Sequence, residues 1–341
     1  MSLTVQKPGL LSTFQDEGRA GFQHQGIPAA GAMDARAHRL ANVLAGNTAD
    51  EATLEITLMG PMLRFEAPAC IALAGADLGA TLDGEPLPLL RPLVVRAGAV
   101  LAFGAPRTGT RAYLAVHGGF ALDPVMGSFS TYLRSGFGGF QGRALARGDR
   151  VGFRHALTDE PARLDALARE LWDLRIYLPA TLRALQRPTV RFLPGLHWDE
   201  FNQASRHAFA EGEYRISAQS DRMGYRLDGP TLAMTAPRQI LSEATSFGTV
   251  QVPAGGQPIV LMADRQTTGG YPKLAQIAAV DLPVLAQFAP GQTLRFAPIA
   301  LDEAQQLDAA RAQAFAALEA ALAPLRAQLA GHVLAAEKDS A

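Results

Sequence analysis

Glycine and proline divide this chain into short apolar runs. The 33 glycines and 22 prolines lie between hydrophobic segments that are long enough for strands but too short for long helices. Both residues disfavour the interior of a helix, and both are common in the turns that join strands. The pattern therefore predicts a mainly β protein with some α-helix.

Three segments interrupt this pattern with apolar residues at helical spacing. The first follows Asp34, which is a good N-cap residue, and ends at Gly46. The second covers about residues 157–187, where leucines recur among charged residues. The third runs from about Asp302 to Ala336, with a break at Pro324. We interpret the second segment as a connector between domains and the third as a helical tail without a chemical role.

A chain of 341 residues is long enough for two domains with separate cores. The helical connector places one domain at residues 1–156 and the other at residues 188–300, with the connector at 157–187 and the tail at 301–341. This linear order of domains is an expectation from composition and periodicity alone.

Composition excludes several classes of partner. The net charge is −1 and charged residues make up 18% of the chain, so neither nucleic acid nor a charged membrane surface is expected as a partner. No opening signal peptide and no long apolar span are found, and the single cysteine, Cys70, lies in an apolar run. We therefore expect a buried thiol, a reducing compartment and a cytoplasmic protein. One cysteine and seven scattered histidines also argue against a metal site.

Residues 264–273 carry the strongest indication of function. They follow the apolar run 258–263, which is typical of a buried strand, and they combine an acid, two bases, an amide, hydroxyls and paired glycines. The segment ends at Lys273, although the only other lysines, Lys7 and Lys338, lie near the termini. Lysine is a compact charge that loses its proton more readily than arginine when it is buried. The alternative is a surface loop with an incidental lysine.

Other polar clusters also adjoin strand-like runs. One surrounds Gly224 in residues 217–227, another contains Glu243, and a third begins at Gln251. Strand ends converge on one pocket in many β proteins, where cations and backbone N–H groups steady a developing oxyanion. The alternative is a network of structural ion pairs.

A further candidate group lies near the amino terminus, in residues 16–34. Its glycine-rich loop ends at a helix N-terminus and offers N–H groups to an anion. Arg19 would grip a carboxylate or phosphate, and His24 would move a proton near neutral pH. The alternative is an ordered turn with Asp34 as a helix cap.

Together these clusters define the candidate site. The candidate catalytic residues are Asp221, Arg222, Glu243, Asp264 and Lys273. The candidate substrate-binding residues are Arg19, His24, Gln251, Arg265, Gln266, Thr267, Thr268, Gly269, Gly270 and Tyr271. The chain has no Gly-x-x-x-x-Gly-Lys loop, no Gly-x-Ser-x-Gly elbow and no His-Glu-x-x-His motif.

In this order and combination, the motifs resemble those of the biotin-dependent carboxyltransferase family. The resemblance covers about residues 5–300 and is carried by residues 18–19, 31–34, 54–55, 60–61, 220–227, 248–253 and 264–273. The family includes the carboxyltransferase part of urea carboxylase, proteins labelled allophanate hydrolase subunit 2, and the C subunit of prokaryotic 5-oxoprolinase. The resemblance implies two cyclophilin-like β-barrel domains joined by a helical connector.

The resemblance also implies an activity. Stand-alone bacterial members work with a B-like and an A-like subunit in a complex that opens 5-oxoproline to glutamate, with ATP consumed by the complex. Two positions depart from the family pattern: Ala30 replaces a frequent serine, and Phe129 replaces a usual arginine. A hydroxyl or guanidinium role is therefore not expected at these two positions.

Two other functions stay open. One is carboxyl transfer from carboxybiotin to urea or a similar acceptor. The chain has no Ala-Met-Lys-Met-like attachment site, so biotin would have to be supplied by another chain. The other is a non-enzymatic protein that binds and regulates a kinase. The dense polar clusters argue against this last function, because docking surfaces favour aromatic anchors.

Overall fold

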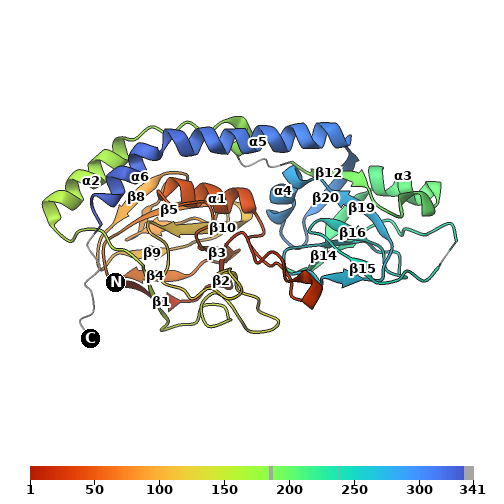
Figure 1. The fold of residues 1–341 in the computed structure, drawn as a ribbon, viewed down its shortest axis with the longest axis horizontal. Coiled ribbons are helices and arrows are strands. Elements are labelled where there is room, and N and C mark those ends of the chain that lie inside the picture. Colours follow the sequence, from red (N-terminus) through yellow and green to blue (C-terminus); the bar gives the residue numbers. More distant parts are fainter. Residues whose placement is uncertain (184–186, 237, 334–341) are drawn as a thin grey trace. The chain divides into compact units, whose positions relative to one another are not determined.

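A computed structural model describes residues 1–183, 187–236 and 238–333 of the chain (Figure 1). The chain divides into two compact units. The first contains Met1–Gly18, Ala35–Arg183 and the described part of residues 314–341. The second contains Arg19–Asp34 and the described part of residues 184–313. A linear order of domains does not anticipate that residues 19–34 group with the second unit, or that residues 314–333 group with the first.

The first unit contains two antiparallel sheets that enclose one core. The six-stranded sheet has the order β11 (Arg150–Gly152), β1 (Ser2–Lys7), β4 (Met62–Phe65), β9 (Val100–Ala102), β6 (Thr81–Leu82) and β7 (Glu85–Pro86). The five-stranded sheet has the order β2 (Leu11–Gln15), β3 (Thr53–Thr57), β10 (Thr108–Val116), β5 (Ala69–Asp77) and β8 (Pro92–Val95). Leu3 and Phe65 of the first sheet are buried with Ile56 and Ile71 of the second, because alternate residues of each strand face the same interior.

Two helices cover this unit. The helix predicted after Asp34 is confirmed as α1 (Ala35–Leu44), which packs on β5 and β10. The predicted leucine pattern forms α2 (Pro161–Asp173), which packs on β8, and a 3-10 turn, η2 (Ala180–Leu182), follows it. Cys70 is confirmed as a buried free thiol in β5.

The second unit is a closed barrel of seven strands. Their order is β12 (Thr189–Pro194), β19 (Lys273–Ile277), β16 (Thr249–Gln251), β17 (Ile259–Leu261), β14 (Gly224–Asp228), β13 (Glu213–Ile216) and β20 (Thr293–Pro298). Parallel pairing of β12 with β20 closes the ring. Phe209 stacks on Phe296 with ring centroids 4.5 Å apart in a buried aromatic core. The prediction of a mainly β protein is confirmed.

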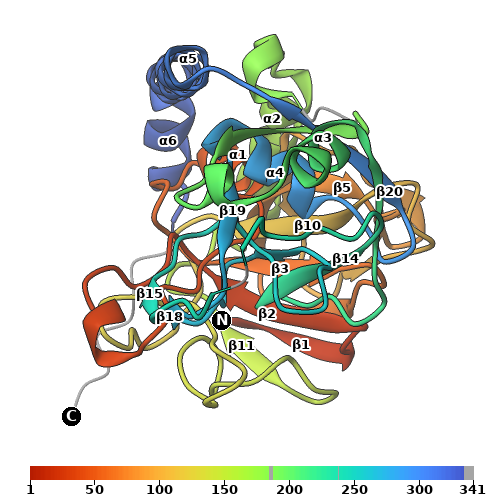
Figure 2. The ribbon, with the colours of Figure 1, turned by 90° about the vertical axis from the view of Figure 1, so that its right-hand side faces the viewer.

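Short elements complete the second unit. The helices α3 (Gln203–Glu211) and α4 (Leu282–Ala286) accompany the 3-10 turns η1 (Gln23–Gln25), η3 (Trp198–Glu200) and η4 (Ala279–Asp281). Outside the barrel, β15 (Glu243–Ala244) pairs with β18 (Thr268–Gly269) in a two-stranded ribbon. Figure 2 shows this ribbon at the periphery of the unit, away from α3 and α4 and on the same side as η1.

The predicted carboxy-terminal helix is confirmed as two helices, α5 (Leu301–Ala321) and α6 (Ala323–Ala330). Pro324 stands in the first turn of α6, where its missing N–H costs nothing, so the helix is interrupted just before it. The predicted continuation to Ala336 lies outside the described residues. Among the described helices, none has the length and apolar character that a membrane crossing requires.

Candidate functional site

Lys273 begins β19, and its side chain reaches back to β15. Its Nζ atom donates hydrogen bonds to Glu243 Oε2 and to the Ala244 carbonyl oxygen, both at 2.8 Å. The Lys273 side chain is 13% exposed and that of Glu243 is 39% exposed, so the ion pair lies at the edge of the solvent. An ammonium group has three donors, and two of them are used by these contacts. One N–H of Lys273 therefore remains for a ligand.

The β15–β18 ribbon explains why Glu243 meets Lys273. Register pairs Glu243 with Gly269, so the segment that leaves β17 returns beside β15 before it enters β19. The hydrogen bond from Lys273 lowers the pKa of the Glu243 carboxyl, and the nearby positive charges act in the same direction. Glu243 is therefore ionised at neutral pH and suits orientation of Lys273 better than proton donation.

His197 supports the same lysine from the other side and was not among the residues predicted from the sequence. Its Nδ1 atom accepts a hydrogen bond from the Lys273 backbone N–H at 3.0 Å, and its own backbone N–H donates to the Lys273 carbonyl oxygen. The ring is buried, and an accepting Nδ1 places the proton of the neutral ring on Nε2. The sequence held no signal for this contact, because it is made with the main chain of Lys273.

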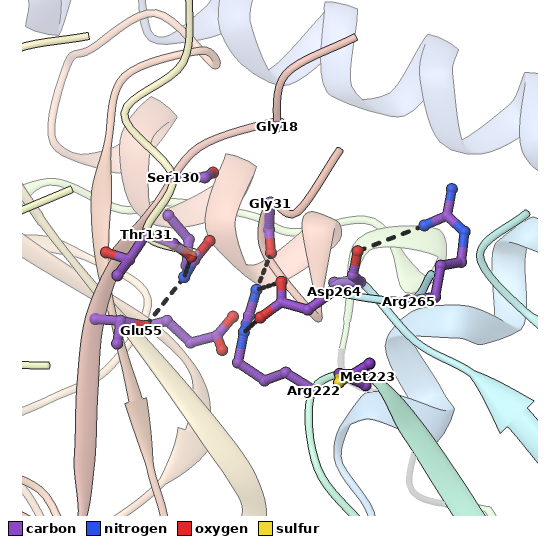
Figure 3. Close-up of polar contacts among 12 residues, drawn as sticks. Gly18, Gly31, Glu55, Ser130, Thr131, Arg222, Met223, Asp264 and Arg265 are labelled. Atoms are coloured by element: carbon purple, nitrogen blue, oxygen red, sulfur yellow. Dashed lines mark hydrogen bonds and ion pairs between the residues drawn. The ribbon is translucent and has the colours of Figure 1, made fainter. Parts of the chain in front are cut away.

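Arg222 and Asp264 form a buried ion pair within the second unit. The guanidinium donates through Nε and Nη2 to the two carboxylate oxygens, at 3.0 and 2.9 Å, and both residues are 4% exposed. Nη2 also donates to the Gly31 carbonyl oxygen at 2.6 Å. Figure 3 shows the guanidinium between these two acceptors. The charges of this predicted pair are directed at each other, which favours a role in holding the residue 19–34 segment to the strand ends.

Asp221 has a local role in the structure. Its side chain accepts hydrogen bonds from the backbone N–H groups of Met223 and Gly224, at 2.8 and 3.2 Å, and thereby shapes the turn before β14. The residue is exposed. The turn orients the chain so that the next side chain, Arg222, points inward.

Gln251 has an unsatisfied amide nitrogen beside the glycine pair. The residue is 5% exposed, and its Nε2 atom makes no hydrogen bond with the described residues. Register pairs Gln251 with Lys273 across β16 and β19, and a Cβ added to Gly269 would lie 2.6 Å from Gln251 Nε2. A buried amide without a partner costs about 1–3 kcal/mol, so a ligand acceptor is a natural partner for this group.

Arg265 also has guanidinium N–H groups that make no strong hydrogen bond with the described residues. Burial lowers the pKa of its guanidinium, and the charge of Asp264 opposes this shift. Its Nη1 atom lies 3.5 Å from the Ala263 carbonyl oxygen, and its buried Nε makes no hydrogen bond with the described residues. The side chain extends away from Arg222 (Figure 3). It therefore suits an incoming anion.

The remaining predicted residues surround the ribbon. Gln266, Thr268 and Tyr271 are exposed, while Thr267, Gly269 and Gly270 are partly buried. The backbone of Gln266 and Thr267 is tied to Thr245, which donates to both carbonyl oxygens.

The two residues at the amino-terminal side differ in their burial. Arg19 is buried, and its backbone N–H donates to the Ala29 carbonyl oxygen, whereas His24 is exposed in η1. Gly31, whose carbonyl oxygen accepts from Arg222, directly follows Ala30, and both adopt a left-handed backbone, with φ of 55° at Ala30 and 94° at Gly31.

A separate buried polar cluster in the first unit was not part of the predicted site. Asp16 accepts hydrogen bonds from the Ser128 and Ser130 hydroxyls, at 2.7 and 2.5 Å, and from the Phe129 backbone N–H at 2.6 Å. Phe129 thus contributes its main chain to this cluster. The available signal was Asp16 itself, an acid directly after a strand, but its partners lie more than a hundred residues away.

Among the described residues, no group of three or more histidine, cysteine, aspartate or glutamate side chains has the arrangement of a metal site.

Comparison with known proteins finds similar sequences over most of this chain. The model of the carboxyltransferase domain, subdomain A and B, matches residues 25–298. The 5-oxoprolinase C subunit of Escherichia coli (strain K12) is 42% identical over 89% of this chain and 93% of its own length. The same-named protein of Haemophilus influenzae is 38% identical over 87% of this chain and 91% of its own length.

A solved structure of a related protein has the same fold. The urea carboxylase of Kluyveromyces lactis matches 98% of this chain with a TM-score of 0.83 and 27% identity, although the match spans only 30% of that longer protein. The resemblance inferred from motifs is confirmed by sequence and by structure, and the chain belongs to the carboxyltransferase domain family with subdomains A and B.

Proposed function

We propose that this chain is the C subunit of an ATP-dependent 5-oxoprolinase, which opens 5-oxo-L-proline to L-glutamate together with B-like and A-like partner subunits. The observation that carries the proposal is the 42% identity to a 5-oxoprolinase C subunit over 93% of that protein's length.

The chemistry of the substrate suits the residues around the ribbon. 5-Oxoproline carries a carboxylate and a lactam carbonyl, and a lactam is a stable amide that needs activation before water opens it. The remaining Lys273 donor and the Arg265 guanidinium supply positive charge for the carboxylate or for charge that develops on the lactam oxygen. The Gln251 amide supplies a neutral donor nearby.

Glu243 and His197 act through Lys273 in this proposal. Glu243 fixes the direction of Nζ, and His197 fixes the backbone from which the side chain extends. Arg222 and Asp264 secure the loop that holds Gly31.

ATP is a co-substrate of the proposed reaction. The chain lacks a Gly-x-x-x-x-Gly-Lys phosphate loop. We therefore assign ATP consumption to the assembled complex and activation of the lactam to the joint action of its subunits.

A direct assay tests the proposal. Glutamate release from 5-oxoproline and ATP is measured with the purified chain alone and then with its co-purified or neighbour-encoded partners. Glutamate formed only with the partners is the expected result. A stably assembled complex that forms no glutamate would contradict the proposal.

The second candidate is carboxyl transfer from carboxybiotin to urea or a related acceptor. It is favoured by the structural match to a urea carboxylase over 98% of this chain. The identity is lower than for the 5-oxoprolinase proteins, and biotin would have to arrive on another polypeptide. Streptavidin blotting of co-purified proteins separates the two candidates, since a biotinylated partner is expected only for carboxyl transfer.

A further inference from the structure

The first unit contains a pocket that is independent of the residues around the ribbon. Its volume is about 410 Å³, within the range of small-molecule sites. Its walls come from the end of α1, from the segments after β10 and β11, and from α6. The lining residues are Gly46, Asn47, Thr48, Glu51, His117, Gly118, Arg154, His155, Arg326, Ala330 and Val333.

Basic groups predominate in this lining. Two guanidinium groups and two imidazoles face one carboxylate. Arg154 pairs with Glu51 and donates through Nε to the Gly118 carbonyl oxygen at 3.0 Å. Arg326 donates through Nη2 to the Asn47 carbonyl oxygen at 2.6 Å, and its guanidinium makes no other hydrogen bond with the described residues. Arg326 therefore keeps most of its five donors for a ligand.

The two histidines add donors of a different kind. His117 is buried, and its Nδ1–H donates to the Ala45 carbonyl oxygen at 2.8 Å, so Nε2 is the nitrogen that gains a proton. Burial lowers the pKa of His117, and the positive charges of His155 and Arg326 lower it further. An anion in the pocket would offset that positive potential. The His155 ring makes no hydrogen bond with the described residues.

We propose that this pocket binds a small anion that carries phosphate groups. Arg326 would hold a phosphate oxygen through its open donors, and the ring N–H of His155 would donate to a neighbouring oxygen. Arg326 lies on α6, whereas His117 and His155 follow β10 and β11. The pocket therefore forms only when α6 packs against the end of α1. The volume exceeds the needs of one phosphate group, which favours a pyrophosphate or the phosphate portion of a nucleotide.

Calorimetric titration of the full chain tests the proposal without any assay of turnover, so its outcome does not depend on the proposed 5-oxoprolinase function. The probes are inorganic phosphate, pyrophosphate, ATP and adenosine. We expect pyrophosphate and ATP to bind and adenosine not to bind. Binding of ATP alone would identify a nucleotide as the source of the phosphate groups, whereas similar affinities for ATP and pyrophosphate would identify the phosphates as sufficient. No binding of any of the three anions at about 10 mM would overturn the proposal.

Two variants locate the binding. Arg326→Gln removes the open guanidinium, and Ala330→Glu places a negative charge at the pocket wall on an exposed position of α6. Each should weaken binding roughly tenfold or more. Arg107→Gln is the matched control, because it removes an exposed arginine of the same unit that does not line the pocket. Unchanged affinity in both pocket variants, or an equal loss in the control, would reject this pocket as the site.

Discussion

The ammonium group of Lys273 lies 2.8 Å from the carboxylate of Glu243, thirty residues earlier in the chain. The contact exists because β15 and β18 pair as a ribbon, which returns the segment after β17 to the side of Glu243. The ribbon thus brings together the partly buried ammonium group of Lys273, the Glu243 carboxylate that orients it, and the glycine pair Gly269–Gly270.

Replacing Lys273 by methionine should abolish the proposed activity of the assembled complex, with a loss of at least about a hundredfold in kcat/KM, because the change removes the charge that we propose faces the substrate. Stability should change little, since the pair is partly exposed. The measurements are glutamate release and the thermal midpoint. Lys7→Met, at an exposed position of β1, is the control. Undiminished turnover in Lys273→Met would remove this lysine from the mechanism.

The Lys273–Glu243 pair should also make stability depend on pH. The hydrogen bond lowers the folded-state pKa of Glu243 below its unfolded value. The stabilisation is therefore present above the unfolded pKa of about 4.3 and is lost as the pH falls through the folded-state pKa. Thermal unfolding of wild type and Glu243→Gln should differ at pH 7 and converge at the acid end. In the Lys273→Met background the pair is absent, so Glu243→Gln should cause no pH-dependent change in the thermal midpoint. A pH-dependent change in that background would refute the pairing.

Lys273 and its neighbours could be selected as candidates from the sequence because their composition is unusual. A rare lysine after a buried strand and before another apolar run is visible without any structure. The helix from Ala35 to Leu44 was visible for a similar reason, since its period, its cap residue and Gly46 all lie within a few positions.

The contacts that sequence could not predict are all long-range. Nothing near His197 indicates that its ring receives the Lys273 backbone N–H, 76 residues away. The hydrogen bond from Arg222 to Gly31 spans 191 residues, and it groups the amino-terminal loop with the second unit. Arg222 and Asp264 were both predicted as site residues, but only the structure shows that they form an ion pair with each other.

The Arg222–Asp264 pair should matter more for stability than Asp221 does. Asp264→Asn removes the carboxylate charge that faces the buried Arg222 guanidinium, and breaking such a pair typically costs about 3–5 kcal/mol. Asp221→Ala removes only exposed turn hydrogen bonds and should cost about 1 kcal/mol. Urea unfolding of the full chain, followed by fluorescence, measures both. Equal costs for the two variants would contradict the structural role of the buried pair.

Cys70 should report on opening of the first unit. Burial raises the pKa of its thiol to about 12, whereas an unfolded cysteine titrates near 8.5. The folded thiol is thus protonated and shielded at pH 8, and its contribution to stability is lost as the pH rises from about 8.5 toward 12.

A thiol reagent at pH 8 should label the native chain only at the rate of opening, and urea should accelerate labelling to the rate of a free thiol. Because Cys70 is the single cysteine, Cys70→Ala supplies a blank for the assay. Rapid labelling of the native chain would show that β5 is accessible and that the core around it is not closed.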